Sequence, residues 1–364
     1  MQYPFFSASR IQQSLSSRGG AILKSKGQNF LVDPNSVRRI GNCVMSLLPE
    51  TLKSADTGTG ESRAAGNSSE EIFTESEGPR IGPSERSGEI PAECEILEIG
   101  PGTGALSFFL WESLFALANS NPETRFRYRA LELDPVLCSI LEEETLPAWR
   151  ERHSIMDSSH PHSNLEFQII EGDARSFLTE TGGDAVTGKK GGTESGSKSA
   201  QVINIICGNL PYYISTELLL LSIKQAPHAC CFLVQKEYAM RILETKKSSS
   251  IAVFVRNFME PLKGPAIARN SFLPPPAVES TVLMLKGHEV RCDPGLLEPL
   301  LRMSFQGKRK TLRNSWRNSG GSLPVEALEE AATACGVDSM ARAEDLSPES
   351  FYGMVGYLAG RLPA

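Results

Sequence analysis

The sequence predicts an α/β fold in which a doubly wound parallel sheet is followed by a small all-α domain. Apolar runs of strand length alternate with helical patterns between residues 94 and 285. That alternation is typical of a parallel sheet with crossover helices. From about residue 294 onward the apolar residues follow helical periodicity. The first part of the chain is therefore expected to form the sheet and the last part a helical domain.

Each expected element is bounded by turn or capping residues. The expected strands are 94–100, 128–134, 165–171, 202–206, 229–234, 251–255 and 280–285. The expected helices are 36–48, 108–117, 135–146, 236–244, 294–305, 308–316, 324–335 and 348–358. Asp33 and Pro34 are the expected N-cap and first residue of the first helix, and Ser215 and Thr216 are expected to cap a further one.

Segments poor in large apolar residues divide the chain. We expect flexible insertions at about residues 51–90 and 181–199, where small and charged residues dominate. Residues 1–23 give little periodic signal and are expected to form a flexible N-terminal arm. The predicted organisation is this arm, an α/β domain at 24–287 that contains both insertions, and a helical domain at 288–364.

Composition limits the classes of protein that the chain can belong to. No apolar run approaches the about 20 residues that span a bilayer, and the N-terminus lacks the pattern of a signal peptide. We expect a cytoplasmic monomer with no membrane association. The eight cysteines include no CxxC pair, which indicates reduced thiols and no metal site.

The net charge of −6 hides a cationic segment near the C-terminus. Much of the acid lies between residues 51 and 89, whereas residues 303–317 contain none. A charge run is most often a solvated face, but this one includes Trp316, and we interpret it as a surface that contacts RNA phosphates. The expected contacts are Arg302, Lys308, Arg309, Lys310, Arg313 and Arg317.

Four consecutive predicted strands end in residues that suit one ligand. They are Gly100 in a glycine-rich loop, Glu132, Asp173 and Asn209. Any one of them alone is more commonly part of a tight turn or a solvated loop. Glu132 can accept both hydroxyls of a ribose, and Asp173 can accept from an adenine amino group. Because the carboxyl ends of such strands line one crevice, the four together imply S-adenosylmethionine.

The stretch Asn209-Leu210-Pro211-Tyr212 suits a planar base with an amino group. Pro211 favours extended geometry at Leu210, so the Asn209 amide and the Leu210 carbonyl can face one point. Tyr212 would stack on an extruded base. Phe272 is a candidate for the opposite face of the base, or else a core anchor. For the whole stretch, the alternative is an ordinary strand-to-helix turn with an exposed tyrosine.

Taken together, these motifs resemble the ribosomal RNA adenine dimethyltransferases. The similar blocks run in order from about Lys24 to the C-terminus, apart from the insertions. They are Lys26–Leu31, Glu98–Gly104, Glu132–Asp134, Glu171–Ala174, Gly208–Tyr212, Gln235–Glu237, Phe272–Ser280 and Arg309–Ser315. The resemblance implies a Rossmann-like class I S-adenosylmethionine-dependent methyltransferase domain with a small C-terminal all-α domain. It also implies which residues contact S-adenosylmethionine: Asn29, Leu31, Gly100, Glu132, Asp173 and Asn209.

The activity implied by the resemblance is dimethylation of N6 on two adjacent adenosines near the 3′ end of small-subunit rRNA, within an assembling 30S particle. The Asn209 side chain and the Leu210 carbonyl would accept the two N–H groups of the adenine. Such acceptors favour a pyramidal nitrogen that can attack a methyl group. Positioning and oriented dipoles then carry the reaction, and no strong base is needed.

Two departures from the family and two alternatives remain. Tyr213 stands where an asparagine is common, and Lys247–Ser250 replaces a Tyr-Gly pair. One alternative is a large-subunit rRNA methyltransferase of the macrolide-resistance type. The Arg309–Ser315 block and the triple proline argue against it. The other is a non-catalytic nucleic-acid-binding relative, as in mitochondrial transcription factors, and the intact Asn209–Tyr212 stretch argues against that.

Overall fold

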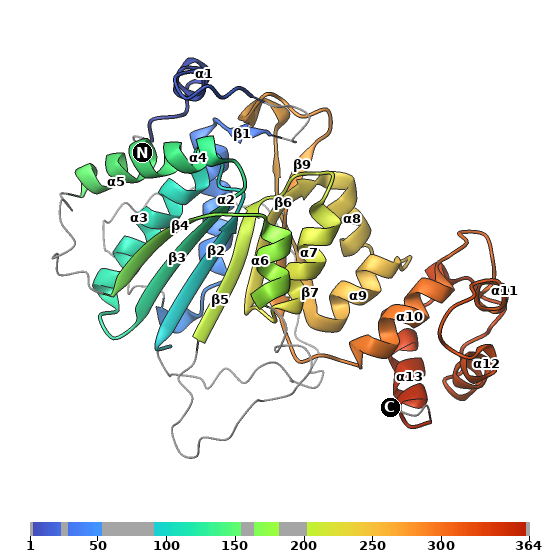
Figure 1. Ribbon diagram of the computed structural model, residues 1–364. Coiled ribbons are helices and arrows are strands. Elements are labelled where there is room, and N and C mark those ends of the chain that lie inside the picture. Colours follow the sequence, from blue (N-terminus) through green and yellow to red (C-terminus); the bar gives the residue numbers. More distant parts are fainter. Residues whose placement is uncertain (1–2, 23–27, 53–90, 154–163, 182–201, 362–364) are drawn as a thin grey trace, which may run out of the picture.

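The computed structural model describes residues 3–22, 28–52, 91–153, 164–181 and 202–361. The insertions expected at about 51–90 and 181–199 fall almost entirely outside these residues. A seven-stranded sheet forms the centre of the molecule, with strand order β4-β3-β2-β5-β6-β9-β7 (Figure 1). Its strands are β2 (Glu93–Ile99), β3 (Arg125–Glu132), β4 (Leu165–Glu171), β5 (Val202–Asn209), β6 (Ala229–Gln235), β7 (Met259–Ile267) and β9 (Ser280–Gly287).

The sheet is mixed. Strands β4, β3, β2, β5 and β6 are parallel, as predicted, but β9 runs antiparallel to both β6 and β7. Between β7 and β9 the chain forms β8 (Phe272–Leu273) and no α-helix. Without a crossover helix the chain returns antiparallel. The α/β class is confirmed, and the expectation of a wholly parallel sheet was wrong.

Residues 251–255 were expected to form a strand and instead belong to helix α9 (Ser250–Phe258). The Ser249 hydroxyl accepts from the Ala252 amide at 3.2 Å and caps this helix. Val253 and Val255 are fully buried because α9 is covered on several sides. A short apolar run of this kind does not distinguish a buried helix from a buried strand.

Strand β7 was not predicted, because its sequence contains residues that usually break strands. Pro261, Gly264 and Pro265 lie within it, and its pairing with β9 is irregular between Lys263 and Ala266. Strand β7 lies at the edge of the sheet. Prolines are tolerated there because an edge strand leaves part of its backbone without a partner.

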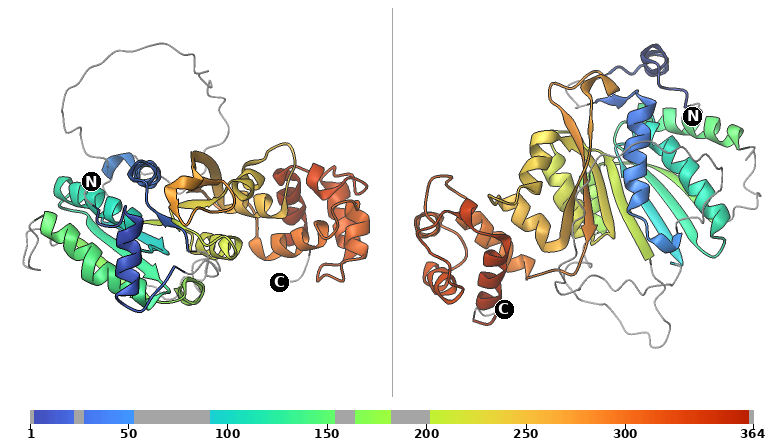
Figure 2. Two further views of the ribbon diagram at one scale, coloured as in Figure 1. Left: turned by 90° about the horizontal axis from the view of Figure 1, so that it is seen from above. Right: turned by 180° about the vertical axis from the view of Figure 1, so that it is seen from behind.

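Helices cover both faces of the sheet (Figure 2). One face carries α2 (Pro34–Ser46), α3 (Ala105–Ser120), α4 (Pro135–Ile140) and α5 (Leu146–Arg152), and the other carries α6 (Ala174–Thr181), α7 (Ser215–Lys224), α8 (Lys236–Leu243) and α9. Helix α1 (Ala8–Ser16) lies beyond the ends of the strands, next to α4 (Figure 1). Successive strand residues face opposite cores, as Ile96 and Leu97 do. Among the described helices, none combines the length and apolar character of a membrane span.

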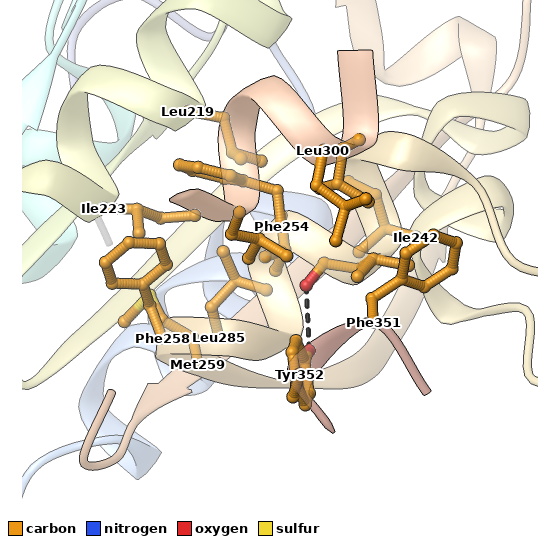
Figure 3. Packing of buried hydrophobic residues seen from close by; sticks show 14 of the residues in the cluster. Leu219, Ile223, Ile242, Phe254, Phe258, Met259, Leu285, Leu300, Phe351 and Tyr352 are labelled. Carbon is orange, nitrogen blue, oxygen red and sulfur yellow. Dashed lines mark hydrogen bonds between the residues drawn. The ribbon is translucent and has the colours of Figure 1, made fainter. Parts of the chain in front are cut away.

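The C-terminal part is helical, as predicted. It contains α10 (Pro294–Ser304), α11 (Leu312–Arg317), α12 (Val325–Ala334) and α13 (Pro348–Ala359). Helix α11 is shorter than the expected 308–316. Leu300 of α10, Phe351 of α13 and Phe254 of α9 belong to one apolar cluster, which Figure 3 shows. The Tyr352 hydroxyl donates to the Val253 carbonyl at 2.9 Å across the same contact.

The N-terminal arm expected at residues 1–23 is a packed segment where the structure describes it. Phe5 and Ile11 are fully buried, and Ile11 lies on helix α1. This helix has only nine residues, which is too few for apolar periodicity to identify it reliably. The segment belongs to the same core as α2 and α3.

Candidate active site

The four predicted strand-end residues lie at one edge of the sheet. Gly100 follows β2, Glu132 ends β3, Asp173 follows β4 and Asn209 ends β5, and these four strands are neighbours in the order β4-β3-β2-β5. Strand order reverses between β2 and β5, which is where ligands of open α/β sheets bind. The topology therefore brings the predicted residues to one edge of the sheet.

Asn209 is tied to Asn29. Strand β1 (Phe30–Leu31) pairs with β8, and the Asn209 side chain donates from Nδ2 to the Asn29 carbonyl at 2.9 Å. The side-chain oxygen of Asn209 cannot occupy that position, because two acceptors would then face each other. Oδ1 is thus left on the other side as an acceptor. The Leu210 amide donates to the Leu233 carbonyl at 3.2 Å, which fixes the next peptide.

The glycine-rich loop opens towards Asn209. Gly100 has a φ of +67°, and a Cβ added there would lie 3.9 Å from its nearest neighbour, the Asn209 carbonyl oxygen. Together with Asn29 and Leu31, these residues line a cavity of about 30 Å³. That is about the space of one water molecule. Gly100 and Asn209 therefore border the same small space, whereas Glu132 and Asp173 do not line it.

Glu132 is buried and satisfied by backbone amides. Its carboxylate accepts from Gly102 at 3.0 Å, from Leu133 at 2.9 Å and from Asp134 at 3.0 Å. Burial raises the pKa of Glu132, and these three amides oppose the shift. The carboxylate links the end of β3 to the glycine-rich loop. Two carboxylate oxygens have about four lone-pair sites, so capacity for ribose hydroxyls remains.

Asp173 is paired within the protein. Its carboxylate accepts from the backbone amide of Arg175 at 2.8 Å and from the Arg175 guanidinium at 2.6 Å. These hydrogen bonds hold the pKa of Asp173 below its usual value. The carboxylate is therefore charged, and any ligand amino group would share it with Arg175.

Tyr212 and Phe272 lie in different surroundings. Tyr212 is half-buried, and its hydroxyl lies 2.5 Å from the Ser280 hydroxyl. Phe272 is only 2% exposed and pairs with Leu31 across β1 and β8. This burial favours the alternative of a core anchor, and stacking of Phe272 on a base stays an untested prediction. The short β1–β8 ladder covers its ring.

The turn after Pro211 differs in detail from the prediction. Ser215 is the first residue of α7 and does not cap it; its hydroxyl donates to the Pro211 carbonyl at 2.9 Å. Tyr213, the departure from the family pattern, is 65% exposed. The other departure, Lys247–Ser250, leads into α9, with Ser249 as its cap.

A much larger groove lies away from the strand ends. It has a volume of about 890 Å³ and lies between α7, α8 and α9 on one side and α10 with the following C-terminal residues on the other. We call it the interdomain groove. Its cationic lining residues are Lys224, Arg241, Lys247, Arg302, Lys308, Lys310 and Arg342. Its lining includes Thr216, which lies close in sequence to Tyr212. Its volume alone would favour it as the active site, but none of Gly100, Glu132, Asp173 and Asn209 lines it.

The predicted basic segment divides into two groups. Arg302, Lys308 and Lys310 line the interdomain groove, and Arg309 beside them is exposed. Arg302 also pairs with Glu298 at 3.2 Å. The other group is Arg313 and Arg317, which both pair with Glu329 at 3.0 Å. Lys308 and Lys310 thus differ from Arg302, Arg313 and Arg317, each of which pairs with an acidic residue.

A buried carboxyl beside the glycine-rich loop was not identified from the sequence. Glu98 is 1% exposed and accepts from the Ser107 hydroxyl at 2.7 Å and from the Tyr128 hydroxyl. Burial raises the pKa of Glu98 to about 7. Its position shortly before Gly100 was visible in the sequence, but its hydroxyl partners come from other elements.

The chain is similar to known proteins of one family. The ribosomal RNA adenine dimethylase family matches residues 86–360. A curated "Ribosomal RNA small subunit methyltransferase A" of Lachnoclostridium phytofermentans is 30% identical over 73% of this chain and 82% of its own length. One from Listeria welshimeri is 27% identical over 96% of this chain and 95% of its own.

A solved structure shares the fold. The dimethyladenosine transferase of Plasmodium falciparum has a TM-score of 0.50 and 21% identity, over 73% of this chain and 90% of its own. The family match covers most of the chain and includes the strand ends and the Asn209–Tyr212 stretch. The chain therefore belongs to the ribosomal RNA adenine dimethylase family, and it is a methyltransferase that uses S-adenosylmethionine as the methyl donor.

Proposed function

We propose that this protein dimethylates N6 of two adjacent adenosines near the 3′ end of small-subunit rRNA during assembly of the subunit. The observation that carries the proposal is the hydrogen bond from Asn209 Nδ2 to the Asn29 carbonyl, which leaves Oδ1 as an acceptor at the sheet edge. The curated relatives from Lachnoclostridium phytofermentans and Listeria welshimeri, both small-subunit methyltransferases by name, support this choice of substrate.

The strand ends fit S-adenosylmethionine, which supplies the methyl group on its sulfonium. Glu132 would accept from the ribose hydroxyls, and Asp173 from the adenine amino group of the cofactor. The open side of Gly100 lets the backbone approach the ligand closely. Asn29, Leu31 and Asn209 would border the remaining part, because they line the same small cavity as Gly100. These roles are supported by the position of the residues at one edge of the sheet.

The target adenine would be held by Asn209 and Leu210. Oδ1 of Asn209 and the Leu210 carbonyl would each accept one N6 hydrogen, which favours a pyramidal, more nucleophilic nitrogen. Pro211 keeps this stretch extended. Tyr212, fixed through its hydroxyl by Ser280, would stack on one face of the base, worth about 1–3 kcal/mol. Preorganised acceptors then account for catalysis without a strong base.

The RNA around the target would lie along the interdomain groove. Lys308 and Lys310 line it and form no ion pair within the described part of the chain, whereas Lys247 there pairs with Glu344 at 3.1 Å. Arg309 adds an exposed cation. Phosphate contacts of this kind position RNA and depend on salt. The proposed partner is an assembling 30S particle, and the proposed location is the cytoplasm, where such particles would be met.

The test is transfer of labelled methyl groups from S-adenosylmethionine to small subunits, and in parallel to large-subunit rRNA, purified from a strain that lacks this methylation. We expect N6,N6-dimethyladenosine at two adjacent positions, seen as primer-extension stops and a mass shift. Methylation of large-subunit rRNA only would favour the macrolide-resistance type of enzyme. Binding to small subunits without methyl transfer would favour a non-catalytic relative.

A further inference from the structure

The N-terminal segment, residues 3–20, is attached to the glycine-rich loop. The Tyr3 hydroxyl lies 2.7 Å from both the carbonyl and the hydroxyl oxygen of Thr103. Both residues are buried, with exposed fractions of 5% and 2%. Tyr3 also packs edge-on against Phe108 in the first helix after the loop, with 5.7 Å between ring centroids. A residue near the start of the chain therefore contacts the loop that follows β2.

The same loop is held from the other side by the π-helical turn Leu141–Thr145. The Thr145 hydroxyl donates to the Thr103 carbonyl at 2.9 Å. Gly104 has a φ of +86°, and a Cβ added there would lie 2.8 Å from the Thr145 methyl carbon. Thr103 thus contacts both the N-terminal segment and the π-helical turn, and Gly104 lies against the π-helical turn.

The N-terminal segment and the π-helical turn are also joined directly. Arg10 and Arg18 pair with Glu144 at 2.6 and 2.5 Å, and the Ser14 hydroxyl donates to the same carboxylate. Burial alone would raise the pKa of Glu144, but the Ser14 hydroxyl and the two arginines outweigh it and hold the pKa below its usual value. The N-terminal segment, the glycine-rich loop and the π-helical turn therefore each contact the other two.

We propose that Tyr3 is a positioning residue for the S-adenosylmethionine site, acting through Thr103. The loop contains Gly100, Gly102 and Gly104, all at positive φ, so its own sequence leaves it many conformations. External hydrogen bonds at Thr103 select the one that is presented to the ligand. The inference rests on the proposed function, because it assumes that this loop contacts the cofactor.

The test uses Tyr3→Phe, which removes only the hydroxyl. The matched control is Tyr352→Phe, since Tyr352 is also buried and donates to a backbone carbonyl, that of Val253 at 2.9 Å, in the C-terminal cluster. Calorimetric titration with S-adenosylmethionine and with S-adenosylhomocysteine measures affinity directly. We expect Tyr3→Phe to weaken both by about three- to tenfold and Tyr352→Phe to weaken neither. Thermal unfolding of both variants separates a loss of affinity from a loss of stability.

A second variant tests whether Tyr3 acts through Thr103. Thr103→Val removes the hydroxyl that faces Tyr3, and combining it with Tyr3→Phe should weaken affinity by less than the product of the two single effects. Unchanged affinity in Tyr3→Phe, or equal losses in Tyr3→Phe and Tyr352→Phe, would overturn the inference. Failure of the wild-type chain to bind either ligand would instead contradict the proposed function.

Discussion

The Asn209 side chain donates a hydrogen bond to the Asn29 carbonyl, with 2.9 Å between the two atoms. This contact fixes which way the Asn209 amide faces. We expect Asn209→Ala to leave affinity for S-adenosylmethionine partly intact but to lower turnover by about 10²–10³-fold, the usual effect of losing one preorganised group that acts on the reacting atoms. Calorimetry and single-turnover methyl transfer to undermethylated small subunits measure the two quantities separately.

Asn257→Ala is the control for that substitution. Asn257 is buried, donates to the Cys292 carbonyl at 3.0 Å and accepts from the Cys292 amide at 2.9 Å. It belongs to helix α9 and not to a strand end. Its replacement should lower stability without changing turnover of the folded enzyme. If both variants lost turnover equally, the effect of Asn209 would be structural and the proposed acceptor role would be contradicted.

Glu132 is expected to act on binding. Glu132→Ala should abolish activity at ordinary cofactor concentrations by weakening S-adenosylmethionine affinity at least about tenfold, because charged hydrogen bonds are worth about 1.5–3 kcal/mol. Glu171→Ala is the control, since Glu171 is exposed and lies opposite Glu132 in the β3–β4 pairing. Calorimetric titration of both variants decides the matter. Equal loss of affinity in Glu132→Ala and Asn209→Ala would argue against their separate roles.

Much of the sheet could be predicted because each buried strand ends in a polar or glycine-rich segment. Gly100, Glu132, Asp173 and Asn209 were found in this way, and the parallel order of β4, β3, β2 and β5 brings them together. Residues 251–255 were mispredicted because nearly all of them are buried, so the run has no alternation of polar and apolar residues that would reveal its period. Periodicity within a short enclosed run therefore does not decide between helix and strand, and the flanking residues have to.

The partners of the site residues could not be predicted, since they come from distant parts of the chain. The Asn29 carbonyl, the Ser280 hydroxyl beside Tyr212 and the Tyr3 hydroxyl beside Thr103 all depend on tertiary contacts. Every residue has a backbone carbonyl, so residue type does not reveal which carbonyl accepts a given hydrogen bond. Burial of Phe272 is likewise decided by the β1–β8 pairing, and its sequence was compatible with either role.

Lys308 and Lys310 line the interdomain groove, and their combined replacement should weaken RNA binding. We expect the double variant Lys308→Gln/Lys310→Gln to reduce the slope of log affinity against log salt by about 0.7–0.9 for each phosphate that the protein no longer neutralises. Filter binding to small subunits at several salt concentrations measures this. Affinity for S-adenosylmethionine should not change.

Arg313→Gln/Arg317→Gln removes the same formal charge and serves as the comparison. Because both arginines pair with Glu329, their replacement also frees an acidic group, and we expect a smaller change in the salt slope. A larger change than in the lysine double variant would show that the RNA contacts lie along α11 rather than in the groove.

Glu98 is expected to make stability depend on pH. Burial raises its pKa from 4.5 to about 7, so between these values the folded protein holds a proton that the unfolded chain has released. Stability from this group is therefore present at low pH and is lost as the pH rises towards 7. Glu98→Gln keeps an acceptor for the Ser107 and Tyr128 hydroxyls but cannot titrate. Denaturant unfolding at pH 5, 6, 7 and 8 should show the wild type losing on the order of 3 kcal/mol relative to this variant, with no further change above pH 8. Parallel curves for the two proteins would mean that Glu98 is already ionised at pH 5, with the Ser107 and Tyr128 hydroxyls compensating its burial.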